Sequence, residues 1–334
     1  MKRLIHPGVV VAALLVLASI WFPASGVTAG TAASYNPSAP VTAQSINRGA
    51  IAILRWYSAN TATTFNSSGG QPVAAAFDGQ NIWIANQTTN NVTKLRANDG
   101  GVLGTFRVGT QPIALAFDGA NIWVANGGSN NVTKLRAKDG SVLATIAVGT
   151  TPEGLAFDGA NIWVGNFSSN TVTKLQASDG TVLGTFAVGQ GPYGLAFDGL
   201  SIWVALANGN TVTRLRASDG KVLGTFAVGT SPVGVAFDGQ NIWVTNFGGS
   251  SVSELSAANG ALLGTFAVGS GPVGVAFDGS NIWVGSTDGT ATKLRASDGK
   301  LLGTFPTGAL SMGVAFDGVN IWVTNSGFNT ISKM

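Results

Sequence analysis

The sequence predicts an all-β protein, and within that class a seven-bladed β-propeller built of four-stranded antiparallel blades. A phrase close to AFDGxNIW occurs seven times, with spacings of 40 residues five times and then 39. A constant period of this length is typical of repeat architectures such as propellers and solenoids. No part of the repeat has helical periodicity. The phrase begins at Ala76, Ala116, Ala156, Ala196, Ala236, Ala276 and Ala315.

One repeat, residues 112–151, contains four short segments that are rich in β-branched and aromatic residues. Turn sequences with Asp, Asn and Gly separate these segments. Four strands in about 40 residues is the pattern of one propeller blade. A single blade cannot bury both of its apolar faces, so neighbouring blades must stack on it. The expected strands are 113–117, 122–125, 132–136 and 142–148.

The two ends of the chain predict how the ring closes. The last repeat stops at Met334, after a segment that matches only the third strand of the other repeats. Residues 54–65 (LRWYSANTATTF) align without gaps with residues 95–106 (LRANDGGVLGTF), which lead into a fourth strand. We therefore expect residues 61–65 to complete the last blade as its outer strand. An open solenoid is the alternative, but we identify no segments that would cap its ends.

The first 29 residues predict a secretory signal peptide. Lys2 and Arg3 precede an uncharged apolar run over 8–22, and small residues at 27–29 offer a cleavage site. This run is short for a membrane-spanning helix, which needs about 20 apolar residues, and an uncleaved anchor is the alternative. The predicted domains are a signal peptide (1–29), a flexible leader (30–50) and the propeller (51–334). We expect an exported protein that is periplasmic, extracellular or on the cell surface, without a membrane span after signal cleavage.

Composition excludes several classes of function. Removal of Lys2 and Arg3 leaves 16 basic and 15 acidic side chains, a formal charge of +1, whereas nucleic-acid binding needs clustered Lys and Arg. The only histidine is His6, inside the predicted signal, and the chain has no cysteine. Histidine acid–base chemistry, thiol nucleophiles and zinc sites with nitrogen or sulfur ligands are therefore excluded beyond the signal. We expect a monomer with no cofactor, no metal and no nucleic-acid partner.

Residues that occur in nearly every repeat are expected to serve the fold. The Asp-Gly turns after strands one and three share one side of the ring, the turn face, and the loops after strands two and four share the other, the loop face. Turn-face aspartates such as Asp118 should cap their own turns, and tryptophans such as Trp123 should pack between blades. Basic residues late in strand three, such as Lys134, should form surface ion pairs. Glu254 replaces this lysine in the fifth repeat and is expected to be a surface change.

The phrase GVAFDGxNIWVTNxxxNTVTKL resembles the YVTN-type and NHL-type β-propeller repeats, and the resemblance covers residues 52–334. Such repeats occur in secreted and surface proteins and in the virginiamycin B lyase-like superfamily. The resemblance implies a propeller fold, which hosts binders, scaffolds and enzymes alike. Virginiamycin B lyase-like enzymes rely on histidine chemistry in a central site, and no residue after His6 can be matched to it.

A specialised site is expected where one repeat departs from the others. The residue after the first position of a blade is apolar in five repeats, but it is Glu153 in the third and Tyr193 in the fourth. These positions lie on adjacent blades, at the loop-face mouth of the central channel. Phe167 follows strand two of blade three, and Leu206 replaces an asparagine in blade four. We predict a ligand-binding pocket made of Glu153, Tyr193, Phe167 and Leu206; the alternative is drift among tolerant loop positions.

Three hypotheses of function follow. The first is a non-catalytic binding or interaction scaffold that recognises a neutral polar ligand, a glycan or a protein, on the loop face, where polar residues surround a few aromatic ones. The second is a streptogramin lyase-like or lactonase-like enzyme that uses Glu153 and a divalent metal. The third is a purely structural surface protein. The absence of His and Cys after the signal favours a non-catalytic role, and we assign no catalytic residue.

Overall fold

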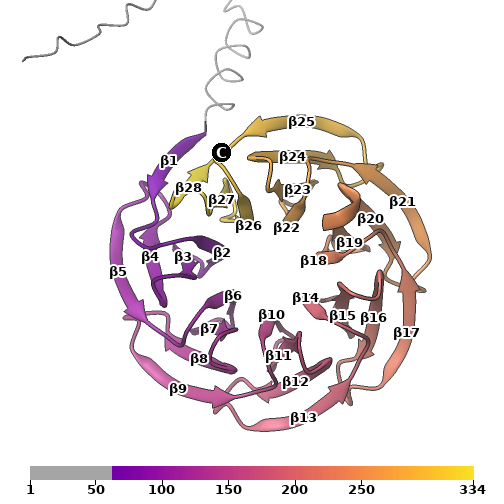
Figure 1. Ribbon diagram of the computed structural model, residues 1–334, viewed down its shortest axis with the longest axis horizontal. Coiled ribbons are helices and arrows are strands. Elements are labelled where there is room, and N and C mark those ends of the chain that lie inside the picture. Colours follow the sequence, from indigo (N-terminus) through magenta and orange to yellow (C-terminus); the bar gives the residue numbers. More distant parts are fainter. Residues whose placement is uncertain (1–61) are drawn as a thin grey trace, which may run out of the picture. The chain divides into compact units, whose positions relative to one another are not determined.

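The computed structural model of this chain describes residues 62–334. These residues form seven four-stranded antiparallel sheets, arranged around a centre as the blades of a ring (Figure 1). The predicted seven-bladed β-propeller is thereby confirmed. The predicted signal peptide (1–29), the leader (30–50) and the first residues assigned to the propeller (51–61) lie outside the described residues. Over residues 62–334 no helix has the length and apolar character needed to span a membrane.

In blades one to six the strands follow one another in chain order from the channel outwards (Figure 1). Blades one to three are β2 (Pro72–Phe77), β3 (Asn81–Asn86), β4 (Asn91–Arg96), β5 (Val102–Arg107); β6 (Pro112–Phe117), β7 (Asn121–Asn126), β8 (Asn131–Arg136), β9 (Val142–Ala147); and β10 (Pro152–Phe157), β11 (Asn161–Asn166), β12 (Thr171–Gln176), β13 (Val182–Ala187). Blades four to six are β14 (Pro192–Phe197), β15 (Ser201–Leu206), β16 (Thr211–Arg216), β17 (Val222–Ala227); β18 (Pro232–Phe237), β19 (Asn241–Asn246), β20 (Ser251–Ser256), β21 (Leu262–Ala267); and β22 (Pro272–Phe277), β23 (Asn281–Ser286), β24 (Thr290–Arg295), β25 (Leu301–Pro306). A single 3₁₀ turn, η1 (Phe247–Gly249), follows β19 within the described residues.

The seventh blade joins the two ends of the described chain. Its inner three strands are β26 (Ser311–Phe316), β27 (Ile321–Asn325) and β28 (Thr330–Lys333), and its outer strand is β1 (Thr63–Asn66). β1 pairs antiparallel with β28, and the Phe65 ring packs against Trp322 with ring centroids 5.6 Å apart. The predicted closure by an N-terminal strand is confirmed. The observed strand begins two residues later than the predicted 61–65, and Thr61 lies outside the described residues.

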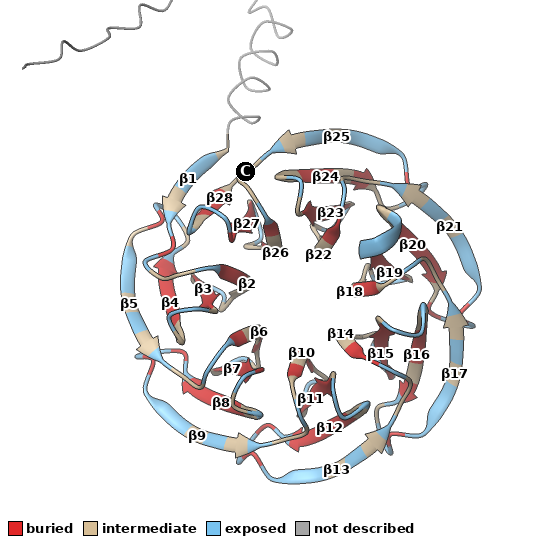
Figure 2. Cartoon of the chain, in the orientation of Figure 1, coloured by how far each residue is buried: buried red, intermediate tan, exposed pale blue. Residues whose placement is uncertain are grey.

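The hydrophobic core lies between the blades. Trp123 of blade two is fully buried and clusters with Leu155, Ile162 and Val164 of blade three, and the same arrangement recurs around the ring. Figure 2 shows the buried residues gathered mainly in the second and third strands of the blades, whereas the outer strands are largely exposed. The prediction that the tryptophans pack between blades is therefore confirmed.

The turn-face aspartate after the first strand of each blade holds both its own turn and the tryptophan of that blade. Asp118 Oδ1 accepts hydrogen bonds from the backbone N–H groups of Ala120 (2.9 Å) and Asn121 (2.7 Å), which confirms the predicted capping. Its Oδ2 accepts a bond from the Trp123 indole Nε1–H at 2.7 Å. Burial alone would raise the pKa of Asp118, but the bonds from Trp123, Asn121 and Ala120 outweigh it and hold this pKa below its usual value.

The strand-three lysines correct the expectation of surface ion pairing. Lys134 is only 6% exposed, and its Nζ donates to the backbone carbonyl of Ala177 in the next blade at 2.7 Å. The same Nζ lies 5.1 Å from the centroid of the Trp123 ring. The lysine stem is long enough to cross the blade boundary while its ammonium group finds carbonyl acceptors there. The equivalent bond from Lys333 to the Ala97 carbonyl (2.8 Å) links the last blade to the first.

The arginines two positions further along do form surface pairs, as predicted. Arg96 and Asp99 lie 2.7 Å apart and are both about half exposed. The same pairing occurs at 3.1 Å in three other blades, where the partners are Arg136–Asp139, Arg216–Asp219 and Arg295–Asp298. Exposed pairs of this kind contribute about 0–1 kcal/mol each. The buried lysines therefore matter more for joining the blades.

Glu254 is not the surface change that the sequence suggested. It stands opposite Trp243 in the strand pairing, where other blades place the lysine, and it is only 8% exposed. Its Oε1 accepts a hydrogen bond from Asn241 Nδ2 at 2.7 Å. Burial and the nearby charge of Asp238 raise the pKa of Glu254, and the Asn241 bond only partly offsets them. The boundary between blades five and six thus lacks the ammonium-to-carbonyl bonds that Lys94, Lys134, Lys174 and Lys333 make at four other boundaries.

We expect Glu254→Lys to stabilise the protein. The new ammonium group can reach the turn carbonyls of blade six, as Lys134 reaches Ala177, and it removes a carboxylate beside Asp238. Charge-assisted hydrogen bonds of this kind contribute about 1–2 kcal/mol, so the thermal midpoint should rise by about 2–4 °C or more. The reverse change, Lys174→Glu, is the matched control and should lower the midpoint. An unchanged or lower midpoint for Glu254→Lys would contradict this account of the blade boundary.

Candidate functional site

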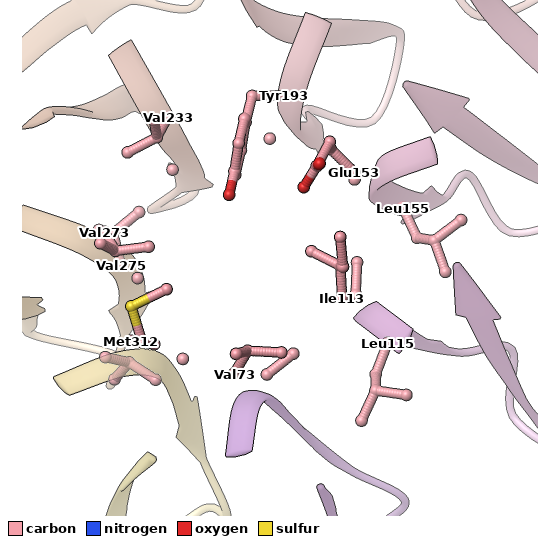
Figure 3. A pocket seen from close by; sticks show the side chains of 18 of the residues that line it. Val73, Ile113, Leu115, Glu153, Leu155, Tyr193, Val233, Val273, Val275 and Met312 are labelled. Carbon is pink, nitrogen blue, oxygen red and sulfur yellow. The ribbon is translucent and has the colours of Figure 1, made fainter. Parts of the chain in front are cut away.

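The centre of the ring holds a cavity of about 210 Å³. Each blade contributes three consecutive residues of its innermost strand to the lining, beginning with the second residue of that strand. Figure 3 shows these side chains around the central channel. The lining residues are 73–75, 113–115, 153–155, 193–195, 233–235, 273–275 and 312–314.

Two polar side chains interrupt this otherwise apolar lining. Glu153 on β10 is the only charged residue among those that line the cavity, and Tyr193 on β14 is the only other one with a polar side chain. Their oxygen atoms both point into the channel from adjacent blades (Figure 3). The structure therefore brings together the two residues that the sequence analysis placed at the channel.

Glycine allows the strands that carry Glu153 and Tyr193 to lie close together. A Cβ atom on Gly154 would overlap the backbone carbonyl oxygen of Tyr193. A Cβ on Gly194 would likewise overlap the carbonyl oxygen of Val233 in the next blade. Removal of the side chain at these positions permits a close backbone approach, so the second residues of neighbouring inner strands face the same small volume.

Burial changes the acidity of both polar groups. Removal from water raises the pKa of Glu153 from its ordinary 4.5 to about 7, and the Tyr193 hydroxyl partly offsets this effect. Burial also raises the pKa of Tyr193, and the charge of Glu153 adds to that rise. Glu153 therefore exchanges its proton near neutral pH, while Tyr193 remains a neutral phenol.

Phe167 lies beside Tyr193, as the predicted pocket requires. Its ring meets the Tyr193 ring edge to face, with centroids 6.2 Å apart and planes at 89°. Such pairs are favourable because the positive edge of one ring meets the negative face of the other. Phe167 directly follows β11 and is half-buried, so it occupies the loop face beside the channel.

Leu206, the fourth residue of the predicted pocket, lies elsewhere. It is 2% exposed and belongs to the core cluster that contains Trp163 and Leu195. At the equivalent position of blade three, Asn166 Nδ2 donates to Thr173 Oγ1 at 2.9 Å. With leucine in place of the asparagine, the Thr213 hydroxyl instead pairs with that of Thr225 at 3.0 Å. Leu206 thus exchanges a buried polar contact for core packing and does not line the cavity.

Sequence analysis missed most of the cavity lining. It identified the second residue of each inner strand, but not that the third and fourth residues also face the channel. The available signal was the repeated order of a variable residue, then Ala or Gly, then Ala, Leu or Val. Because this order resembles an ordinary buried strand, it did not mark the channel.

The described residues offer few metal ligands. Between residues 62 and 334 no three His, Cys, Asp or Glu side chains gather closely enough to hold a metal ion. Asp288 accepts hydrogen bonds from the backbone of Ser270 (2.6 Å) and from the Thr290 hydroxyl (2.7 Å), and so joins its own loop to the loop before β22. The chemistry available in the cavity is that of a carboxyl group and a phenol.

Comparison with known proteins supports the fold only. No protein-family model matches the chain, and no curated protein sequence matches it. Among solved structures, Kuenenia stuttgartiensis hydrazine synthase is similar, with 19% sequence identity and a TM-score of 0.70 over 81% of this chain and 97% of that one. In all, 1738 solved chains match. At this identity, and for a fold shared so widely, the similarity establishes the propeller architecture and does not indicate an activity.

We predict that ionisation of Glu153 makes the protein less stable as pH rises. The folded state binds the Glu153 proton more tightly than the unfolded state does, so its stabilising effect is present below pH 4.5 and is lost as pH rises to about 7. A shift from 4.5 to about 7 corresponds to about 3 kcal/mol. The free energy of unfolding of Glu153→Gln, relative to that of native protein, should therefore be higher at about pH 8 than at about pH 4.5. Thermal or urea unfolding at both pH values measures this difference. If the stability of the two proteins changes equally between these pH values, Glu153 does not have the raised pKa.

Proposed function

We propose that this protein is a non-catalytic binding module that recognises a protein segment or a glycan on its loop face, with one group of the ligand entering the central cavity. The observation that carries this proposal is the break in repeat symmetry at Glu153 and Tyr193. Five inner strands place an aliphatic or thioether side chain at that position, and the two exceptions are neighbours that share one cavity. A propeller that only spaced other domains would not need this carboxylate.

The loops around the channel support a recognition role. A loop-face groove of about 550 Å³ is lined by residues with hydrogen-bonding side chains: Gln71, Gln87, Thr88, Asn90, Thr110 and Gln111, together with Gly128. Phe247 is 44% exposed and Phe328 is 66% exposed. Adaptable polar groups beside rigid aromatic rings are typical of binding surfaces. We place this module outside the cytoplasm on the strength of its N-terminal sequence.

Glycan-array and pull-down experiments test the proposal. We expect the native protein to retain a ligand, and Glu153→Ala and Tyr193→Ala each to weaken its binding by about tenfold or more, as loss of a central contact does. Val273→Ala is the matched control, because it trims an apolar side chain in the same channel. Binding that is unaffected by either polar substitution would reject this pocket as the recognition site.

Proton-transfer catalysis in the same cavity is a second candidate function, and the raised pKa of Glu153 is the observation that favours it. A carboxylate that titrates near neutral pH can take a proton from a substrate and return it. Hydrolysis or elimination of lactones would use Glu153 as the base and Tyr193 to orient the substrate.

A panel of lactones, with and without Mg²⁺ or Ca²⁺, tests this second candidate. If it is correct, turnover should rise as pH passes through about 7 and should fall by about 100-fold or more in Glu153→Gln. Turnover that does not exceed that of buffer, or that is equal in the two proteins, would exclude catalysis by Glu153.

A further inference from the structure

Glu153 is a carboxylate that faces no positively charged side chain. The inner and second strands of blades two to four pack around it: β6, β7, β10, β11, β14 and β15. Apart from Glu153 itself, the only titratable side chain in these strands is that of Tyr193. No lysine or arginine lines the cavity. The strand-three lysines nearby are engaged elsewhere, since Lys134 and Lys174 donate to carbonyl groups of the following blades.

The rest of the cavity is suited to a hydrocarbon group. The other five innermost strands have an apolar residue at the position of Glu153 and Tyr193: Val73, Ile113, Val233, Val273 and Met312 (Figure 3). The volume of about 210 Å³ exceeds the ~150 Å³ of a cavity that takes up benzene. A hydrocarbon group of about the size of benzene can therefore be buried against these side chains.

We propose that the group bound in the central cavity is an ammonium group on a short apolar stem, held by Glu153 and Tyr193. This inference rests on the proposed binding function, and it replaces the neutral ligand expected from the sequence with a cationic one. The ammonium group donates to the Glu153 carboxylate, which neutralises the buried charge. The Tyr193 oxygen accepts a second hydrogen bond, and the aliphatic side chains enclose the stem.

Other ligand classes fit the cavity less well. An anion would meet the Glu153 carboxylate with no cation to offset it, and burial makes that repulsion strong. A sugar ring carries several hydroxyl groups, of which two polar side chains could satisfy only a few, so the others would be buried without partners. An alkylammonium ion has one polar end and one apolar end, as the cavity does. Free small amines and the lysine side chain of a protein partner share this chemistry.

Calorimetric titration of the full chain with n-butylamine tests the inference, with 1-butanol as the neutral probe of equal size. At about pH 8 we expect butylammonium to bind about tenfold or more tightly than butanol. Its affinity should fall by about tenfold or more at about pH 5.5, because Glu153 titrates near pH 7 while the amine stays protonated. Glu153→Gln and Glu153→Ala should each lose this preference, and Tyr193→Phe should reduce it. Asp219→Asn, at an exposed residue paired with Arg216, is the control with the same charge change and should behave as native.

The outcomes separate this inference from the proposed function. Equal affinity for butylammonium and butanol, or binding of butylammonium that survives both Glu153 variants, overturns the inference. Suppose that butylammonium shows no dependence on Glu153, but a ligand found on the loop face does. Then only the ammonium assignment fails. If no ligand of any kind depends on Glu153, the proposed binding function fails as well. Nα-acetyl-lysine methylamide distinguishes the two sources of the group. Its binding at the affinity of butylammonium supports a lysine of a protein partner, and its exclusion while butylammonium binds supports a free amine.

Discussion

The contact between neighbouring blades is the interaction on which the whole structure depends. No blade buries its apolar faces by itself, so each second-strand tryptophan fills the boundary with the following blade. Hydrogen bonds fix these boundaries. In each blade an aspartate holds its own turn and the indole N–H, as Asp118 does, and at four boundaries a lysine donates to carbonyl groups of the next blade. The last link runs from Lys333 to Ala97 and closes the ring.

This repeated boundary limits where a binding site can arise. Residues that hold blades together must stay nearly the same in every copy, and they are buried or committed to hydrogen bonds. The innermost strands have more freedom, because their second residues line the channel. Glu153 and Tyr193 occupy such positions, so they introduce polar chemistry without removing any contact that joins the blades.

The two glutamates of the described region show how position decides the effect of the same side chain. Glu254 replaces a lysine at a blade boundary, where it lies beside Asp238 and leaves the next blade without an ammonium donor. Glu153 replaces an aliphatic residue in the channel, where a cavity adjoins it and a phenol is its partner. Burial raises the pKa of both, and Glu153 also lines the central cavity.

The number of blades, their four strands and the closing N-terminal strand could be predicted from the sequence, because period, turn residues and strand alternation are local properties of the chain. The sequence also identified Glu153 and Tyr193, since a departure from a repeat is visible without coordinates. Three-dimensional packing was needed to show that Lys134 reaches Ala177 in the following blade, that Glu254 is buried and that Leu206 belongs to the core. These outcomes depend on how far a side chain extends across a blade boundary and what it meets there, and the spacing of residues along one strand carries no such information.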